Sequence, residues 1–559
     1  MKRTTRLLCL LLVCVLLFGC APQGENTETT APDSSGAALE TQGSEQGAVK
    51  TEQALAQIAQ LGTSPDDNYR VFYEIFVYSF CDSDGDGIGD LQGVISKLDY
   101  LQDLGINGIW LMPVHPSQSY HKYDVRDYYE IDPQYGTLDD MKQLLDACNE
   151  RDIHVITDLV LNHTGDDHEW FLAACEYLKN LPSGAEPDPS ECPYVDYYYF
   201  SRESKNNWYW VNGSEWYYEG QFSPDMPDLN LANEALLGEI RDIMTYWLDM
   251  GVSGFRLDAA KEFYSGDVPG NIEVLNWIQT TATELKPDCY LVAEVWEGFA
   301  NVSRYYTSGI TSIFDFPFGD SNGKITAVLR GAGNANTVSS YAKALEQADT
   351  AYYESNPNYI DAPFLSNHDV GRIAGFVNRD PLKMKMAGAM NIFMSGSCFI
   401  YYGEEIGMLG SGNDPSKRAP MYWNAERDNG TTNPPPDCEL PEEYPLGSLE
   451  EQVNDDASLW NYYRQAIAIR KALPVISHGR TSMEEALNVG CVSAQRKSWN
   501  DQECIILMNI DSVPAQVDLS SYSDWTCVAS LSADGNEIVC NGTTMELPAF
   551  GIAVLIPNA

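Results

Sequence analysis

The segment GFRLDAAKE, residues Gly254–Glu262, joins a short apolar run to a cluster of charged side chains. Similar runs, β-branched or aromatic and ending in polar residues, recur along the chain, and stretches with amphipathic helical spacing lie between them. The strands expected from this pattern are Val71–Tyr78, Gly108–Met112, His154–Val160, Gly254–Asp258, Leu291–Val295, Ile313–Phe316, Phe364–Ser366 and Phe399–Tyr402. Eight strand and helix units in series predict an α/β protein built on a (β/α)8 TIM barrel.

Two segments depart from this alternation. Residues 164–228 are too long for a simple loop and predict a subdomain inserted between strand 3 and helix 3 of the barrel. Its aromatic-rich stretch, 194–222, is expected to form mainly a small core, although exposed aromatic rings can also stack on a ligand. Alternating strands after residue 473 predict a C-terminal antiparallel β-sandwich over 474–559. The barrel is therefore expected over 67–163 and 229–473.

The pattern of the N-terminal residues predicts an export signal. A basic start precedes the apolar run Leu7–Phe18, which is too short to cross a bilayer, and Cys20 follows a small Gly19 as in the signals of bacterial lipoproteins. We therefore expect a lipoprotein signal peptide over 1–20, lipidation of Cys20, and a flexible Gly/Ser/Thr-rich linker over 21–66. The expected location is the bacterial cell surface, anchored to the membrane by lipid, with full secretion as the alternative.

Charge and composition exclude several classes of protein. The chain has 34 Lys and Arg against 81 Asp and Glu, a net charge of −47, which argues against nucleic acid as a partner. Its 12 Trp, 33 Tyr and 18 Phe argue against a disordered acidic chain. We expect a monomer. The cysteines show no zinc-type spacing, and the pairs Cys491/Cys504 and Cys527/Cys540 are expected either as disulfides or as free thiols.

Three carboxylates lie at the carboxyl ends of expected strands 4, 5 and 7: Asp258, Glu294 and Asp369. Each alone has an ordinary explanation as a cap or an ion-pair partner. Because the carboxyl ends of all strands meet on one face of a barrel, however, the three side chains should lie close together. Arg256 lies two residues before Asp258 on the same strand face and would keep that carboxylate ionised. The pattern predicts an active site.

These segments together resemble glycoside hydrolase family 13, the α-amylase family. The resemblance covers about residues 68–559 and rests on DLVLNH over 158–163, the opening segment, VAEV over 292–295 and FLSNHD over 364–369, with flanking matches at 123–129, 226–230 and 402–408. It implies that Asp258 is the nucleophile of a retaining glycosidase, that Glu294 is its general acid and base, and that Asp369 is the third carboxylate at the cleavage site.

The resemblance also implies a substrate and its contacts. The activity it implies is hydrolysis of α-1,4-glucosidic bonds in starch and maltooligosaccharides, as in an α-amylase. Alternatives are an α-glucosidase, a neopullulanase-like hydrolase or a glucanotransferase, and a non-catalytic glycan-binding protein is disfavoured because all three carboxylates are present. Glu262 stands where most α-amylases have histidine, which leaves the leaving-group preference open. The implied substrate-binding residues are Tyr123, Asp124, His163, Arg256, Lys261, Glu262 and His368.

An acidic loop follows the first expected strand. Its sequence, DSDGDGIGD over 82–90, matches the first nine positions of an EF-hand loop, whose hard oxygen ligands select Ca²⁺. The expected ligands are the carboxylates of Asp82, Asp84, Asp86 and Asp90 and the backbone carbonyl of Ile88. The bidentate glutamate of a complete EF-hand is absent, so we expect a structural calcium loop. The resemblance implies a second calcium site at Asn162 and Asp228.

Overall fold

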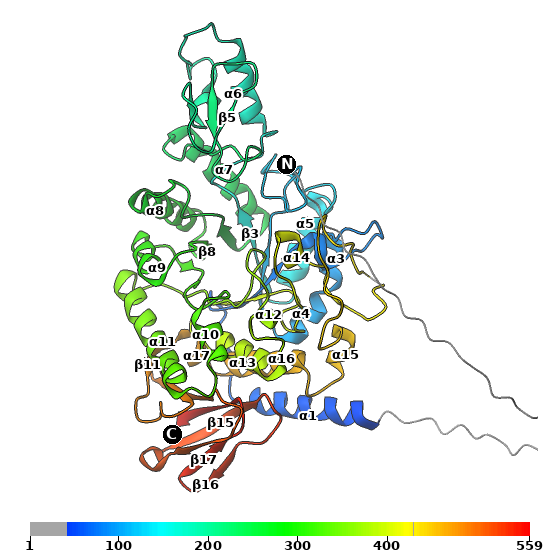
Figure 1. The fold of residues 1–559 in the computed structure, drawn as a ribbon, viewed down its shortest axis with the longest axis vertical. Helices are drawn as coiled ribbons and strands as arrows, with labels where there is room; N and C mark the ends of the chain where they lie inside the picture. The colour runs from blue at the N-terminus through cyan, green and yellow to red at the C-terminus, as the bar shows by residue number, and fades with distance from the viewer. Residues whose placement is uncertain (1–41, 429, 559) are drawn as a thin grey trace, which may run out of the picture. The chain divides into compact units, whose positions relative to one another are not determined.

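The computed structural model describes residues 42–428 and 430–558, with side chains described from residue 50 (Figure 1). The predicted signal peptide, Cys20 and the linker up to residue 41 lie outside the described residues. Within the described part, no helix combines the length and apolarity that a bilayer crossing requires.

A parallel sheet of seven strands, in the order β10-β1-β2-β3-β7-β8-β9, forms the centre of the molecule. Each expected strand but one has a counterpart in it, which confirms the TIM-barrel fold. Aromatic side chains fill the interior, where Phe72 stacks on Phe399 and on Tyr290 with ring centroids 4.8 and 5.1 Å apart. The strands are β1 (Val71–Ile75), β2 (Gly108–Leu111), β3 (His154–Leu159), β7 (Gly254–Leu257), β8 (Tyr290–Ala293), β9 (Ser312–Ile313) and β10 (Cys398–Tyr401).

The strand expected over Phe364–Ser366 is wrong, because this segment forms no regular strand. It still connects the two ends of the sheet. The Asp315 amide of the β9 side donates to the Ala362 carbonyl at 3.0 Å, and the Phe399 amide of β10 donates to the Pro363 carbonyl at 2.8 Å. Pro363 has no N–H group to continue a ladder, so the barrel closes through an irregular segment.

Helices surround the sheet and begin at well-formed caps. Thr137 and Asp140 form a reciprocal capping box at the start of α5, and Asn233 caps α7 through the Leu236 amide. Both helices bury one apolar face against the barrel. The main barrel helices are α3 (Leu91–Ser96), α4 (Leu98–Leu104), α5 (Leu138–Asn149), α7 (Glu234–Met250), α8 (Val268–Leu285), α9 (Phe299–Tyr305), α10 (Lys324–Arg330), α11 (Ala335–Ser355), α13 (Pro381–Ile392) and α16 (Leu459–Ala472).

The predicted insertion between β3 and α7 is present and stands at the top of Figure 1. Much of its aromatic content forms a small core, as expected: Phe171 meets Tyr198 and Tyr218 at ring-centroid distances of 5.1 and 4.8 Å. The elements are α6 (Glu169–Asn180), the 3₁₀ helix η1 (Pro193–Asp196), and a three-stranded sheet of β4 (Phe200–Ser201), β6 (Tyr217–Glu219) and β5 (Trp208–Trp210).

The C-terminal domain consists of two antiparallel sheets, as predicted, with a separate apolar cluster that includes Val492, Ile505, Leu547 and Leu555. The eleven cysteines among the described residues are all free, so the disulfide alternative for the pairs Cys491/Cys504 and Cys527/Cys540 is wrong. The five-stranded sheet holds β11 (Arg480–Met483), β12 (Val492–Trp499), β13 (Gln502–Asn509), β18 (Gly551–Pro557) and β15 (Trp525–Ser532), and the three-stranded sheet holds β14 (Ala515–Asp518), β17 (Thr544–Leu547) and β16 (Val539–Asn541).

The flexible linker expected over 21–66 is wrong for its last part, because residues 42–58 form helix α1 (Gln42–Ile58). From residue 50 on, this helix is held against the barrel: Thr51 and Ile58 are buried, and Glu52 pairs with Arg464 of α16 at 2.9 Å.

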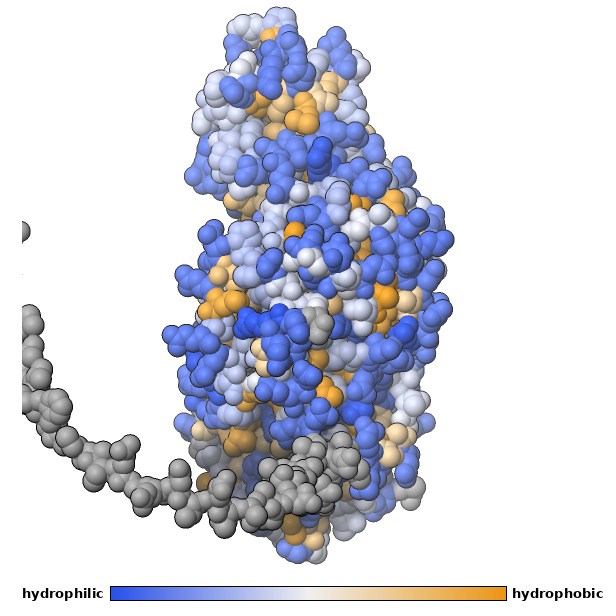
Figure 2. Space-filling view, turned by 90° about the vertical axis from the view of Figure 1, so that its right-hand side faces the viewer, coloured by the Kyte–Doolittle hydropathy of each residue, from blue (hydrophilic) through white to orange (hydrophobic). Residues whose placement is uncertain are grey.

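The surface of the protein agrees with its high content of charged residues. Figure 2 shows a largely hydrophilic face on which apolar side chains gather only in small patches.

Candidate active site

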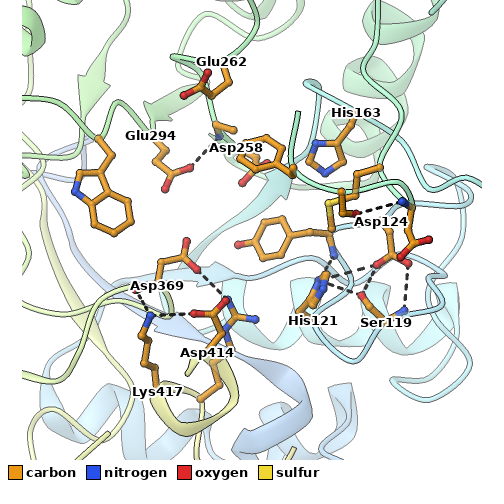
Figure 3. Close-up of a pocket in the computed structure, with 18 of the residues that line it drawn as sticks. Ser119, His121, Asp124, His163, Asp258, Glu262, Glu294, Asp369, Asp414 and Lys417 are labelled. Carbon is orange, nitrogen blue, oxygen red and sulfur yellow. Dashed lines mark hydrogen bonds and ion pairs between the residues drawn. The ribbon is translucent and has the colours of Figure 1, made fainter. Parts of the chain in front are cut away.

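A cavity of about 960 Å³ opens at the carboxyl ends of the barrel strands (Figure 3). The structure brings the three predicted carboxylates together in its wall, each from a different part of the barrel. Other lining residues come from the loops after β2, β3 and β10 and from the insertion. The lining includes Gln118, Ser119, His121, Tyr123, Asp124, His163, Phe222, Asp258, Lys261, Glu262, Glu294, Trp296, Asp369, Asp414, Lys417 and Arg418.

One guanidinium group joins the acidic residues at the base of the cavity. Nη1 of Arg256 lies 2.7 Å from both Asp258 Oδ1 and Asp158 Oδ1, and Nη2 lies 2.9 Å from Glu294 Oε2. Arg256 is completely buried. A buried cation without partners would be very costly, so Asp158, Asp258 and Glu294 stabilise the charge of Arg256, and Arg256 in turn favours the charged form of each carboxylate. The ion pair predicted between Arg256 and Asp258 is present.

Glu294 lies in a buried environment that favours the protonated form of its carboxyl group. Burial raises the pKa of Glu294, against the opposing effect of the Arg256 charge. Its Oε2 accepts a hydrogen bond of 2.9 Å from the Ala259 amide. Ala259 has a φ of 45°, a conformation that residues with a side chain rarely adopt, and such strain concentrates at functional sites.

Asp369 is held as a carboxylate by two cations. Arg418 Nη2 lies 2.9 Å from Asp369 Oδ1, and His368 Nε2 lies 3.1 Å from Oδ2. Burial alone would raise the pKa of Asp369, but His368 and Arg418 outweigh it and hold that pKa well below its usual range. The sequence did not single out Arg418, which follows β10 in a loop without a recognisable signal.

His368 lies between two acids. Its Nδ1 is 2.6 Å from Glu74 Oε1 of β1, and its Nε2 faces Asp369 and, at 2.7 Å, the hydroxyl of Tyr123. Burial lowers the pKa of His368, but Asp369 and Glu74 outweigh it and raise that pKa to about 9. Glu74 was missed because a glutamate within an apolar strand carries no catalytic motif.

Tyr123 and His163 occupy the predicted wall of the cavity. The Tyr123 ring stacks on His368 with centroids 5.4 Å apart, and its hydroxyl donates to Asp158 at 3.2 Å. Burial lowers the pKa of His163. Its Nε2 is buried and has no hydrogen-bond partner among the described residues, so a polar group of a ligand is the natural partner for it.

The remaining predicted substrate-binding residues are Lys261, Glu262 and Asp124, and they are not equally available to a ligand. Lys261 is 3.4 Å from Glu262, and both side chains line the cavity. Asp124 also lines it, but its carboxylate accepts hydrogen bonds from its own loop, from Ser117 Oγ at 2.5 Å and from the Ser119 amide at 3.2 Å. Asp124 therefore shapes the loop in this structure, and its contact with substrate stays a prediction.

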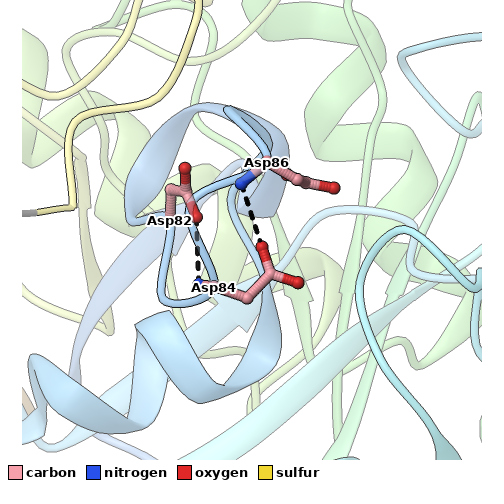
Figure 4. A group of neighbouring side chains, drawn as sticks. All are labelled: Asp82, Asp84 and Asp86. Carbon is pink, nitrogen blue, oxygen red and sulfur yellow. Dashed lines mark hydrogen bonds between the residues drawn. The ribbon is translucent and has the colours of Figure 1, made fainter.

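The acidic loop after β1 brings three of its four aspartates together (Figure 4). Oxygen atoms of Asp82, Asp84 and Asp86 lie within 4.8 Å of one another, a donor set that fits Ca²⁺. Asp90, in contrast, caps helix α3: its oxygens accept from Ser83 and from the Gly93 amide at 2.7 Å. The described geometry supports three of the predicted carboxylate ligands and gives Asp90 a different role.

The two residues of the implied second calcium site contact each other. Asn162 Nδ2 donates to Asp228 Oδ1 at 3.2 Å, and the other oxygen of Asp228 accepts from the Gln221 amide at 2.9 Å. Both oxygens of Asp228 are thus engaged within the protein. The second site stays a prediction.

Comparisons with known proteins agree with this geometry. A family model for the catalytic domain of α-amylase matches residues 74–479. Alpha-amylase 3 of Dictyoglomus thermophilum is 36% identical over 450 residues, which cover 79% of this chain and 85% of that protein. An oligo-1,6-glucosidase of Heyndrickxia coagulans is 30% identical over 492 residues, covering 73% and 86%. The solved structure of Eubacterium rectale Amy13B is 43% identical with a TM-score of 0.86, covering 90% of this chain and 98% of that one.

The chain therefore belongs to the α-amylase family of glycoside hydrolases, family 13. It is an enzyme of that family, and the family membership predicted from the sequence is confirmed.

Proposed function

We propose that the enzyme cleaves α-1,4-glucosidic bonds in starch and maltooligosaccharides with retention of configuration, as an α-amylase does. The observation that carries this proposal is the contact of Asp258 and Glu294 with one guanidinium group, that of Arg256. Two carboxylates that share one cation lie close together, which favours the separation of about 5–5.5 Å found in retaining enzymes over the wider spacing of inverting ones. The likeness to Alpha-amylase 3 supports the choice of substrate.

In this proposal each carboxylate has one task. The Asp258 carboxylate attacks the anomeric carbon while the bond from that carbon to the leaving oxygen breaks, and Glu294 gives its proton to that oxygen. Water then attacks the glycosyl–Asp258 ester, and Glu294 takes the proton of the water. Burial, which raises the pKa of Glu294, keeps a proton available at that carboxyl group for the first step.

Asp369 and His163 would bind the sugar at the cleavage site. Asp369 presents a carboxylate fixed by Arg418 and His368, and an ionised carboxylate stabilises the positive charge that develops on the sugar ring. The unpartnered Nε2 of His163 is available for a sugar hydroxyl. This division of labour predicts that the loss of any of the three carboxylates slows the reaction by orders of magnitude.

The test is the product time course on maltoheptaose with the purified protein. Release of mid-length maltooligosaccharides as α-anomers, read by NMR before mutarotation, is the expected result. Glucose as the first and only product would support an α-glucosidase instead, and longer chains formed at high substrate would support a glucanotransferase. Asp258→Asn should lower kcat at least a thousandfold. Substantial residual turnover in that variant would refute the role of Asp258.

We further propose that the loop over 82–90 binds a structural Ca²⁺ through Asp82, Asp84 and Asp86. The donor set is made of hard oxygens only, which suits this ion. The loop lies against the segment after residue 429: the Asn433 amide donates to the Gly87 carbonyl at 2.7 Å. A bound ion would therefore fix the contact between two distant parts of the chain.

A further inference from the structure

The small sheet of the insertion exposes an aromatic outer face. Trp208 and Trp210 are two positions apart on β5, so their side chains lie on the same side of the sheet, and Tyr217 pairs with Trp210 across β6. Trp210 is 52% exposed, while Tyr218, on the opposite face, is buried in the core of the insertion. The core described above therefore uses one face of this sheet, whereas on the other face Trp210 is exposed and Trp208 and Tyr217 are half-buried.

Contacts around these rings hold them in place. Nε1 of Trp210 donates to the Ser214 carbonyl at 3.0 Å, and the Lys205 ammonium lies 4.1 Å from the Trp208 ring centroid. A ring that is already ordered loses little conformational entropy when it binds a ligand. A large exposed apolar side chain in a strongly acidic protein is a cost to solubility, and an ordered group of such side chains indicates a binding surface.

The base of the hairpin that carries this face adjoins the wall of the catalytic cavity. At the base of the hairpin the Gly220 amide donates to the Asn207 carbonyl at 2.9 Å, and Asn207 Nδ2 donates to Gln221 Oε1 at 3.1 Å. The next residue, Phe222, is 49% exposed and lines the cavity. The chain therefore passes from the aromatic face of the hairpin into the wall of the cavity without an intervening element.

We propose that Trp208, Trp210 and Tyr217 form a second binding surface for the α-glucan chain whose scissile bond lies in the cavity. The C–H faces of a glucose ring are apolar and cover an aromatic ring, and Glu219, which pairs with Trp208, offers a carboxylate to sugar hydroxyls. No aliphatic residue of β5 or β6 shares this face, which favours a sugar over the mixed aliphatic and aromatic core of a protein interface. This inference rests on the proposed function.

The experiment measures binding to insoluble starch by depletion, with Asp258→Asn as the background so that the polymer is not consumed. Adding Trp210→Ala to this background should weaken binding about tenfold, and Trp210→Tyr, which keeps a ring, should retain most of it. The matched control is Leu172→Ala, which removes a 53% exposed apolar side chain from α6 of the same insertion and should not change binding. Circular dichroism and thermal unfolding check that each variant is folded.

A second readout separates this proposal from the proposed function. In the active enzyme, Trp210→Ala should lower the rate on granular starch more than fivefold and change kcat/KM on the short substrate maltotriose less than twofold. If Trp210→Ala turns over maltotriose normally and also binds and hydrolyses starch as the unaltered enzyme does, the proposed second binding surface is wrong. The proposed function is not affected by that result. No turnover of any α-1,4-glucan by the unaltered enzyme would overturn the proposed function. Equal losses in Leu172→Ala and Trp210→Ala would also overturn the second surface.

Discussion

Nδ1 of His368 lies 2.6 Å from Oε1 of Glu74, although the two residues are 294 positions apart in the chain. The contact orients the imidazole so that its other nitrogen meets Tyr123 and Asp369 at the cavity. Glu74 is only 1% exposed and does not line the cavity. It is therefore a positioning residue, which acts on substrate only through His368.

Replacing Glu74 with Gln should shift the pH profile of the enzyme. Glu74 is one of the two acids that raise the pKa of His368 to about 9 against the effect of burial. In Glu74→Gln the imidazole should lose its proton at lower pH, so the alkaline limb of kcat/KM on maltoheptaose should move to lower pH, with about a tenfold drop in peak kcat. The control is Glu405→Gln, a buried carboxylate that accepts from Tyr73 and Tyr100. An unshifted limb in Glu74→Gln would contradict this role.

The same pair predicts how stability depends on pH. The pKa of folded His368 lies above the ordinary value of about 6.5, so its ion pairs stabilise the fold fully below about pH 6.5. That stabilisation is lost as pH rises through about 9. Urea unfolding at pH 6 and pH 9.5 should therefore show a smaller difference in Glu74→Gln than in the unaltered protein, and an equal difference would count against the ion pair.

Arg418 should be important for activity, although it belongs to no recognisable sequence motif. It donates to Asp369 Oδ1, to the His368 carbonyl at 3.1 Å and to Tyr120 at 3.1 Å. The three bonds leave three different nitrogens of the planar guanidinium group, and the single nitrogen of a lysine cannot reach all three acceptors, so Arg418→Lys should lower kcat at least tenfold and the free energy of unfolding by about 2–3 kcal/mol. Arg464→Lys is the control, because Arg464 pairs with the exposed acids Glu52 and Asp103 and should cost at most about 1 kcal/mol. Similar kcat values in the two variants would refute the assignment.

Removal of calcium should lower the melting temperature of the protein. At a free Ca²⁺ concentration a hundred times its Kd, one bound ion stabilises the fold by about 2.7 kcal/mol, which EDTA would abolish. Asp84→Asn should reduce this difference between Ca²⁺ and EDTA, measured by calorimetry, whereas Asp249→Asn, an exposed acid on α7, should leave it intact. If calcium has no effect on the unaltered protein, the proposed site in the loop over 82–90 is wrong.

A buried pair of acids outside the active site should make the fold less stable as pH rises. Burial raises the pKa of Asp315 to about 7, and burial together with Asp315 raises that of Asp361 well above its usual range. Each group holds its proton up to about pH 7 or higher in the folded state but loses it near pH 4 in the unfolded chain. The free energy of unfolding therefore falls between about pH 4 and 7, by up to about 1.4 kcal/mol per pH unit for each group. Asp315→Asn should reduce the loss seen by urea unfolding between pH 5 and 7. An undiminished loss in this variant would argue against the pair.

Much of the site could be predicted because its catalytic groups follow strands at fixed positions. Asp258, Glu294 and Asp369 each end a short apolar run, and barrel topology alone places such residues on one face. Arg418 and Glu74 could not be predicted, since only the folded chain brings them to residues about 50 and 294 positions away. No local pattern records such contacts.

The two errors in the fold have different causes, one local and one tertiary. The apolar run Phe364–Ser366 resembles a strand, but Pro363 immediately before it prevents regular pairing. Helix α1 was hidden by a polar composition typical of linkers, although its Ala, Gln and Glu are good helix formers. What orders its second half is tertiary contact, such as the pairing of Glu52 with Arg464, which a composition cannot show.

Helix α1 packs at the end of the barrel that is remote from the catalytic cavity. The segment from α1 to residue 66 lies beside the loops that precede β1, β2 and β3: Arg70 meets Asp66 at 2.5 Å, and Leu55 shares a second cavity with Gly105 and Arg151. The catalytic cavity opens at the opposite ends of these strands. From residue 50 on, α1 therefore leaves the mouth of the cavity uncovered, and a substrate can reach the cavity without displacing this helix.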